Sequence, residues 1–202
     1  MLAYVLGALM ICAPFIYGQV PEVFTTQRLY AERVTEKHIN YILEIISNEQ
    51  VQQTYGFPSI ATLADAFSQL SIAHNQWEQY GYGLYAIFDK ESSAFIGLGG
   101  YHSVIKDEFN EINCFSIDKP ADLLELYGLL MPSYWRHGYG FEMGAKLIDI
   151  AFSNLPNSCI IAYAKAENHA AVQLMKKLGF TQTGIVTYKD EPHLLYSLSK
   201  KA

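Results

Sequence analysis

The chain has 202 residues, enough for one domain with a substantial hydrophobic core. Half of the residues are hydrophobic and 14% are aromatic, so the composition excludes an intrinsically disordered chain. The formal net charge of -6 argues against a nucleic-acid-binding protein, which would need a basic surface, and agrees with small partners that carry positive charge.

The first stretch of the chain, MLAYVLGALMICAPFIYG, is apolar and contains no Lys or Arg. A membrane-spanning helix needs about 20 apolar residues, and a signal peptide normally begins with positive charge. We therefore expect residues 1–22 to be an N-terminal extension, as an upstream start codon would produce, and residues 23–202 to form the domain of a cytoplasmic protein. Export or membrane anchoring through residues 1–20 stays open as the alternative.

Regular patterns begin near Thr25. Alternation over residues 28–34 predicts a strand, and helical spacing over residues 35–48 predicts a helix with Thr35 as its N-cap. The segment YGFPS interrupts the chain, and a second helix follows it. Its apolar stripe is predicted to contain Ile60, Leu63, Ala64, Phe67, Leu70, His74 and Trp77. On that stripe His74 is expected to be partly buried.

The middle of the chain predicts three strands. Residues 83–88 and 94–104 flank the turn DKESS and form a hairpin, whereas residues 107–119 are either a loop or a further short strand. Residues 122–131, which begin with Asp122, form a continuous apolar run with one acid, Glu125, inside it, as in a strand covered on both faces.

A turn with two glycines leads into the next predicted helix. We expect an inner face of Phe141, Gly144, Ala145, Ile148, Ala151 and Phe152. On the outer face, Glu142 and Lys146 have the spacing of a favourable ion pair.

The last part of the chain predicts a strand at residues 159–164 and a closing hairpin of residues 182–189 and 193–198. Between them Asn168 caps a helix that ends at Gly179. The inner face of that helix is predicted to contain Ala171, Leu174, Met175 and Leu178. The complete order, β-α-α-β-β-β-α-β-α-β-β, predicts an α/β fold with a mixed sheet.

The glycine turn WRHGYG, residues 135–140, joins the apolar strand to the helix. Free amides and the positive end of a helix dipole attract anions, and glycines let the backbone approach a phosphate. Arg136 and His137 add positive or donor groups beside it. By itself the turn is equally compatible with a purely structural role, and it matches neither a Rossmann nor a Walker pattern.

Two motifs in succession, ELYGLLMPSYWRHGYGFEMGAKLIDIAF and AKAENHAAVQLMKKLGFTQTG, resemble the GNAT N-acetyltransferases. The similarity is greatest to the branch that includes ribosomal-protein acetyltransferases and covers residues 25–199. It implies the GNAT fold, a central mixed sheet flanked by helices. It also implies direct transfer of the acetyl group of acetyl-CoA to the primary amine of a protein N-terminus or a small molecule, in a ternary complex.

The resemblance implies a set of cofactor-binding positions. They are Leu130 and Met131 on the strand beside the pantetheine arm, Arg136, His137, Gly138, Tyr139 and Gly140 at the pyrophosphate, and Asn168 at the start of the following helix. Two departures from the family pattern stand out. Arg136 occupies a position where the family usually has glycine, and Met175 one where many members have a tyrosine that protonates the leaving thiolate.

Acetyl transfer to an amine needs a neutral amine and a polarised carbonyl group, and it needs no covalent intermediate. Glu125 is the candidate base, acting through a water molecule, because loss of water inside an apolar strand would raise its pKa. A structural carboxylate is the equally supported alternative. The amide of Leu130 or Met131 is expected to polarise the carbonyl group.

The acceptor amine is less well defined. Candidate lining residues, which would otherwise belong to the core, are Trp77, Tyr80, Tyr82, Tyr101, Tyr127 and His102. The cysteines and histidines lack metal-binding spacing, so no metal is expected. The substitution at Met175 keeps open a second function, a catalytically weak acyl-CoA-binding module of the same fold, and we expect a monomer or homodimer.

Overall fold

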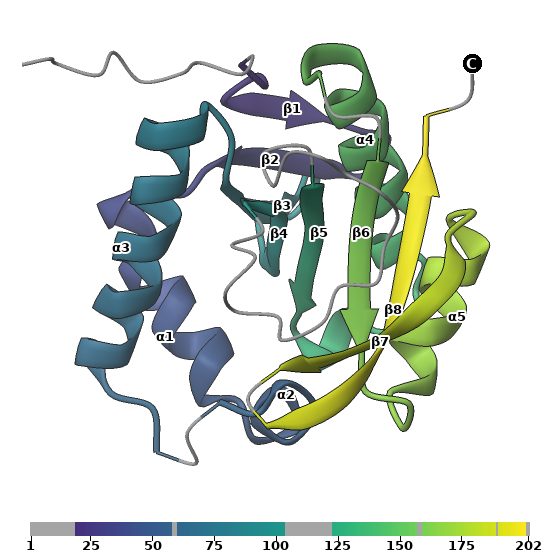
Figure 1. The fold of residues 1–202 in the computed structure, drawn as a ribbon. Coiled ribbons are helices and arrows are strands. Elements are labelled where there is room, and N and C mark those ends of the chain that lie inside the picture. Colours follow the sequence, from purple (N-terminus) through teal and green to yellow (C-terminus); the bar gives the residue numbers. More distant parts are fainter. Residues whose placement is uncertain (1–18, 58–59, 104–122, 157–158, 189, 201–202) are drawn as a thin grey trace, which may run out of the picture.

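Eight strands form one mixed sheet in the order β1-β2-β3-β4-β5-β6-β8-β7, and helices flank both of its faces (Figure 1). This arrangement confirms the predicted α/β fold. The computed structural model describes residues 19–57, 60–103, 123–156, 159–188 and 190–200. The predicted loop or strand at residues 107–119 therefore lies outside the described residues.

The helices and strands follow the expected order with two additions. In chain order they are β1 (Val23–Thr25), β2 (Leu29–Arg33), α1 (Ile39–Ser47), α2 (Glu49–Tyr55), α3 (Leu63–Tyr80), β3 (Leu84–Asp89), β4 (Phe95–Ser103), β5 (Leu123–Leu130), α4 (Tyr139–Asn154), β6 (Cys159–Ala164), α5 (His169–Lys177), β7 (Thr181–Tyr188) and β8 (Glu191–Ser199). Short 3-10 turns lie at Glu36–His38 and Pro132–Tyr134. The additions are β1 and α2. The second of these is a separate helix because the Asn48 side chain ends α1 and accepts hydrogen bonds from the amides of Gln50 and Val51.

The N-terminal end of the described chain packs on the fold. The amide of Val20 donates to the carbonyl of Gly81, and the hydroxyl of Tyr85 donates to the carbonyl of Pro21. Contacts with the domain thus begin before residue 23. Residues 1–18 lie outside the described residues, so their role stays a prediction. Among the described residues, no helix has the length and apolar character needed to cross a lipid bilayer.

Two layers of helices bury the two faces of the sheet. Helices α1 and α3 pack on β3 and β4, whereas α4 packs on β4 and β5 and α5 on β6 (Figure 1). Because side chains alternate along a strand, Leu84 and Ala86 face the first layer, and Tyr85 and Ile87 belong to the core of the second.

The predicted inner face of α3 is wrong in its first half. Ile60, Leu63 and Phe67 are exposed, and so is His74. The buried residues of α3 are Ala66, Leu70, Ala73 and Trp77. Since α3 packs against α1, the small alanine side chains allow a close approach that the larger apolar residues would prevent.

The predicted inner face of α4 is shifted around the helix. Met143, Leu147 and Ile150 are buried, whereas Ala145 is exposed. Glycines in the sheet explain the difference. A Cβ atom at Gly99 would lie 2.4 Å from the Met143 sulphur, so the sheet leaves room there for a methionine side chain.

Substitution of Gly99 by Ala should destabilise the protein by about 1–3 kcal/mol, because the added methyl group overpacks the contact with Met143. Gly184→Ala is the control, since a Cβ there meets nothing within 4 Å, and its effect should stay within about 0.5 kcal/mol. Urea unfolding of both variants measures the difference. Equal stability of the two variants would contradict the packing role of Gly99.

Candidate functional site

Strands β5 and β6 are parallel but pair over a short stretch. The partners are Leu123 with Cys159, Leu124 with Ile160, and Glu125 with Ile161. Beyond this stretch β5 continues to Leu130 and β6 to Ala164, but the two strands are no longer paired. The backbone of β5 after Glu125 therefore has an edge that is not paired with β6.

The direction of the β5 amides shows which of them lie on this edge. The amide of Met131 donates to the Ile96 carbonyl at 2.9 Å, and so points toward β4. Because successive amides of a strand point to opposite sides, those of Leu126, Gly128 and Leu130 point away from β4. The Met131 amide, which was expected to pair with the pantetheine arm or polarise the carbonyl group, is already used within the fold.

Two side chains satisfy carbonyl groups along the same strand. The indole Nε1 of Trp135 donates to the Leu130 carbonyl at 2.7 Å, and the hydroxyl of Tyr55 donates to the Gly128 carbonyl at 3.0 Å. Trp135 thus connects the start of the glycine turn to the end of β5, while Tyr55 connects α2 to its middle.

The glycine turn lies directly after this strand. Arg136 and Gly138 have φ angles of 64° and 83°, in the left-handed region, and α4 begins at Tyr139. For a residue with a side chain this conformation costs roughly 1–2 kcal/mol. This cost explains why the pattern described above usually has glycine where this chain has Arg136. The first amides of α4 have no partner within the helix and can donate to an anion.

Ion pairs and hydrogen bonds from the beginning of the chain brace the turn. Arg28 Nε donates to Glu142 Oε2 at 2.7 Å, and its Nη1 donates to the His137 carbonyl at 3.0 Å. The Thr26 hydroxyl and the Arg28 amide both donate to Glu142 Oε1, at 2.5 and 2.8 Å. Burial raises the pKa of Glu142, but these hydrogen bonds outweigh burial and hold the pKa below its usual value.

The predicted Glu142–Lys146 ion pair is wrong. Lys146 instead pairs with Asp149 at 2.8 Å on the outside of α4. The helical spacing alone could not reveal the competing partner of Glu142, because Arg28 is more than a hundred residues earlier in the sequence.

Glu125 lies among polar and aromatic side chains. It is 8% exposed, and its Oε2 is 3.6 Å from Nδ1 of His102, its cross-strand neighbour. The side chain of Tyr163 lies close to its carboxyl group. The ring centre of Tyr127 is 4.7 Å from that of His102, whose buried Nε2 has no hydrogen-bond partner among the described residues.

The tyrosines around Glu125 stay protonated at neutral pH. Burial raises the pKa of Tyr55 to about 12 and raises that of Tyr127 further. The pKa of Tyr163 is also raised, first by burial and then by the nearby Glu125 carboxylate. These hydroxyls are therefore donors, and the Glu125 carboxylate lies among them as an acceptor.

Most aromatic residues considered for the acceptor site belong to the core. Trp77, Tyr82 and Tyr101 are buried, and Tyr101 donates its hydroxyl to the Leu147 carbonyl at 2.5 Å. His102 and Tyr127 are the candidates that lie beside Glu125. Tyr163 was missed because its position depends on the pairing of the two strands: it lies two residues beyond Ile161, the partner of Glu125, and so on the same face of the sheet.

Helix α5 contains the predicted N-cap Asn168 and also Met175, which departs from the family pattern. Asn168 Oδ1 accepts a hydrogen bond from the Ala171 amide at 3.1 Å, as an N-cap does. Met175 is 6% exposed and belongs to the core, so its position supplies no hydroxyl group to a reaction. Within the described ranges, no group of three or more His, Cys, Asp or Glu side chains is arranged to hold a metal ion.

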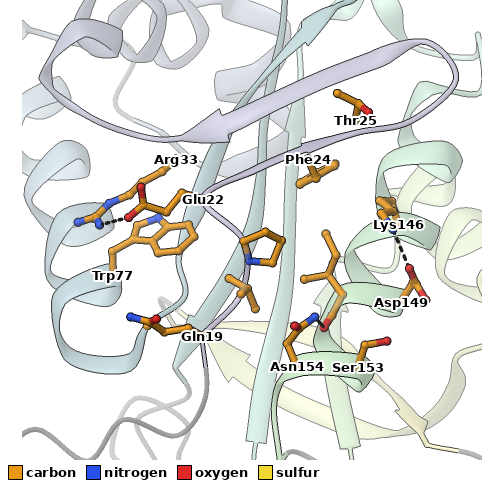
Figure 2. A pocket seen from close by; sticks show the side chains of 14 residues that line it. Gln19, Glu22, Phe24, Thr25, Arg33, Trp77, Lys146, Asp149, Ser153 and Asn154 are labelled. Atoms are coloured by element: carbon orange, nitrogen blue, oxygen red, sulfur yellow. Dashed lines mark hydrogen bonds and ion pairs between the residues drawn. The ribbon is translucent and has the colours of Figure 1, made fainter.

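A hollow of about 890 Å³ lies elsewhere, between the first described residues, the end of α3 and the outer side of α4 (Figure 2). Figure 2 shows that its charged groups pair with each other, Arg33 with Glu22 and Lys146 with Asp149. Neither Glu125 nor any residue of the glycine turn lines it. The hollow is thus separate from the site at β5.

Comparison with known proteins agrees with this geometry. The sequence profile of the acetyltransferase (GNAT) domain family matches residues 28–181. YoaA of Bacillus subtilis (strain 168), named as an uncharacterized N-acetyltransferase, is 23% identical over 164 residues, which are 81% of this chain and 85% of that protein.

Two solved structures share the fold. The acetyltransferase of Agrobacterium tumefaciens C58 has a TM-score of 0.73 at 20% identity, covering 92% of this chain and 98% of that one. The spermidine N-acetyltransferase of Vibrio cholerae, in complex with CoA and spermine, has a TM-score of 0.66 at 12% identity, covering 86% and 96%. At these identities the similarity establishes a common fold.

Replacement of Glu142 by Gln should lower the free energy of unfolding by about 1–2 kcal/mol at pH 7, because its charged hydrogen bonds are lost. The effect is no larger because solvent partly screens the charge of Arg28. The pKa of Glu142 is lower in the folded state than in the unfolded state, where it is about 4.3. Its contribution to stability is therefore fully present at pH values above the unfolded-state pKa and is lost as the pH falls through the folded-state pKa. The difference from wild type, measured by urea unfolding, should therefore shrink at acidic pH. Asp149→Asn, on the exposed side of the same helix, is the control and should have a smaller effect; a larger one would contradict the bracing role of Glu142.

Proposed function

The chain belongs to the GNAT acetyltransferase family, and from that membership we propose how its site works: acetyl-CoA binds along β5 and the glycine turn, and its acetyl group passes directly to a primary amine. The observation that carries the proposal is the end of the pairing between β5 and β6 after Glu125, directly before the glycine turn. An extended, amide-bearing arm needs an unpaired strand edge, and a diphosphate needs free amides. Both lie next to each other here.

The cofactor is bound by backbone groups for the most part. The amides at Arg136, His137, Gly138, Tyr139 and Gly140, together with the positive end of the α4 dipole, hold the diphosphate. The pantetheine arm pairs with the open edge of β5, where the Leu130 amide points away from β4. The proposal retains Asn168 as a further contact, through the amide nitrogen that its capping oxygen leaves available.

The reaction takes place beside Glu125. The carboxylate accepts a proton from the amine, directly or through water, and the neutral nitrogen attacks the thioester carbon. An amide of the open β5 edge stabilises the negative charge that develops on the carbonyl oxygen. The carbon–sulphur bond then breaks, and protonation of the thiolate completes the products, an N-acetylated amine and CoA.

The acceptor is proposed more broadly, as the amine of a protein N-terminus or of a small molecule. The two sequence motifs favour the ribosomal-protein acetyltransferase branch, and the acidic composition suits a cationic partner. The face of the sheet that carries Glu125, Tyr127 and His102 is where we place the acceptor. A cytoplasmic location and a monomeric or homodimeric state stay predictions from the sequence.

Acetyl-CoA should raise the thermal unfolding midpoint of the wild-type protein, since a ligand at 100 times its Kd stabilises the folded state by about 2.7 kcal/mol. Gly138→Asp should abolish this shift, because it adds a side chain and a negative charge at the proposed diphosphate site. Gly56→Asp is the matched control, since Gly56 also has a positive φ and its Cβ would meet nothing within 4 Å. No shift in the wild type would contradict acetyl-CoA binding, and an equal shift in both variants would contradict the assignment of the turn.

Glu125→Gln should lower kcat by about 10²–10⁴-fold with little change in the affinity for acetyl-CoA, as expected for loss of a general base. Acetylation is followed over a panel of primary amines that includes spermine and a peptide with a free N-terminus. The exposed carboxylate of Glu78, replaced by Gln, is the control. Unchanged turnover in Glu125→Gln would overturn the assignment of the base, and tight binding of acetyl-CoA by the wild type without turnover of any amine would favour the acyl-CoA-binding module.

A further inference from the structure

The guanidinium group of Arg28 is fixed against the glycine turn from three directions. Its Nε donates to Glu142 and its Nη1 to the His137 carbonyl. Its Cζ atom lies 4.2 Å from the centre of the Tyr139 ring. The planar group is therefore held by two hydrogen bonds and by stacking, which together fix its position and orientation.

The third nitrogen of this group faces the turn itself. Nη2 lies 3.4 Å from the point where a Cβ atom of Gly138 would stand. Within the described part of the chain, Nη2 makes no hydrogen bond. An Arg side chain has five N–H donors in one plane, so donors remain on Arg28 at the place where the first amides of α4 are also available.

The basic side chains of the turn itself are held differently. Arg136 and His137 are exposed, so a ligand would have to immobilise their side chains. Arg28 is 39% exposed and already immobilised. A donor whose position is fixed in advance loses less conformational entropy when a ligand arrives.

We propose that Arg28 is a cofactor-binding residue of this enzyme: its Nη2 donates to the diphosphate of CoA, while its other two nitrogens hold the turn in the conformation that receives it. The inference rests on the proposed function, since it uses the same diphosphate site. It connects the segment directly before β2 to the site, so that a residue from the N-terminal part of the domain contributes to a site otherwise built from β5, the glycine turn and α4.

The test separates a contact with the diphosphate from a general effect on the fold. Dissociation constants are measured by calorimetry for CoA and for S-acetylpantetheine, which retains the arm and the thioester but lacks the diphosphate. Arg28→Ala should weaken the binding of CoA by about 10- to 100-fold, as expected for loss of charge-assisted hydrogen bonds. Binding of S-acetylpantetheine should change little.

Two further variants complete the experiment. Arg28→Lys keeps the charge, but an ammonium group cannot reach all three partners at once, so this variant should also weaken the binding of CoA more than that of S-acetylpantetheine. It replaces Arg28→Ala if that variant does not fold. Arg33→Ala is the matched control, because Arg33, at the other end of β2, pairs with Glu22 and Glu78 and lies over the Trp77 ring. It should leave the ratio of the two affinities unchanged.

The outcomes distinguish the two proposals. If the wild type binds CoA and the Arg28 variants bind it equally well, the role of Arg28 is overturned and the proposed function stands. The role is also overturned if these variants weaken the binding of CoA and of S-acetylpantetheine by the same factor, because Arg28 then acts through the stability of the fold. If the wild type binds neither ligand, the proposed function fails and the inference fails with it.

Discussion

The site depends on one break in hydrogen bonding, the end of the β5–β6 ladder at Glu125. A strand in the middle of a sheet normally satisfies its backbone on both sides, and an unpaired buried amide costs free energy. After Glu125 the amides that face away from β4 have no partner strand within the described part of the chain, so water or a ligand can pair with them. Glu125, the last residue of β5 that pairs with β6, also carries the carboxylate around which Tyr127, Tyr163 and His102 gather. The open edge thus begins at the residue that carries the carboxylate.

Close packing of α4 determines where its N-terminus lies relative to that open edge. Met143 fills the space left by Gly99, and a Cβ atom at Gly144 would lie 2.7 Å from Leu178 of the neighbouring helical segment. The helix therefore lies against both the sheet and α5. The turn that connects β5 to α4 is short, and it places Arg136 in a left-handed conformation. The bonds from Trp135 to Leu130 and from Arg28 to His137 offset this strain by holding the turn at both ends.

The sequence predicts those features that depend on neighbours along the chain. The strand with Glu125, the glycine turn, the cap at Asn168 and the closing hairpin all follow from local patterns. The faces of α3 and α4 were predicted less well, because small residues, alanines on α3 itself and glycines in the sheet beneath α4, determine which face packs inward. The parts of the site that depend on strand order, Tyr163 beside Glu125 and Arg28 beside Glu142, have no local signal.

A carboxylate in the first turn of α4 would repel a diphosphate, so the position of Glu142 has to be reconciled with the proposed role of the turn. The contacts of Arg28 resolve the conflict. The carboxylate accepts hydrogen bonds from Thr26 and from both the amide and the side chain of Arg28, so its charge is compensated and directed toward β2. Nη2 of Arg28 then faces Gly138. Loss of Arg28 would remove a donor and also leave the negative charge of Glu142 uncompensated near the diphosphate, so an anion at this site depends on Arg28 in two ways.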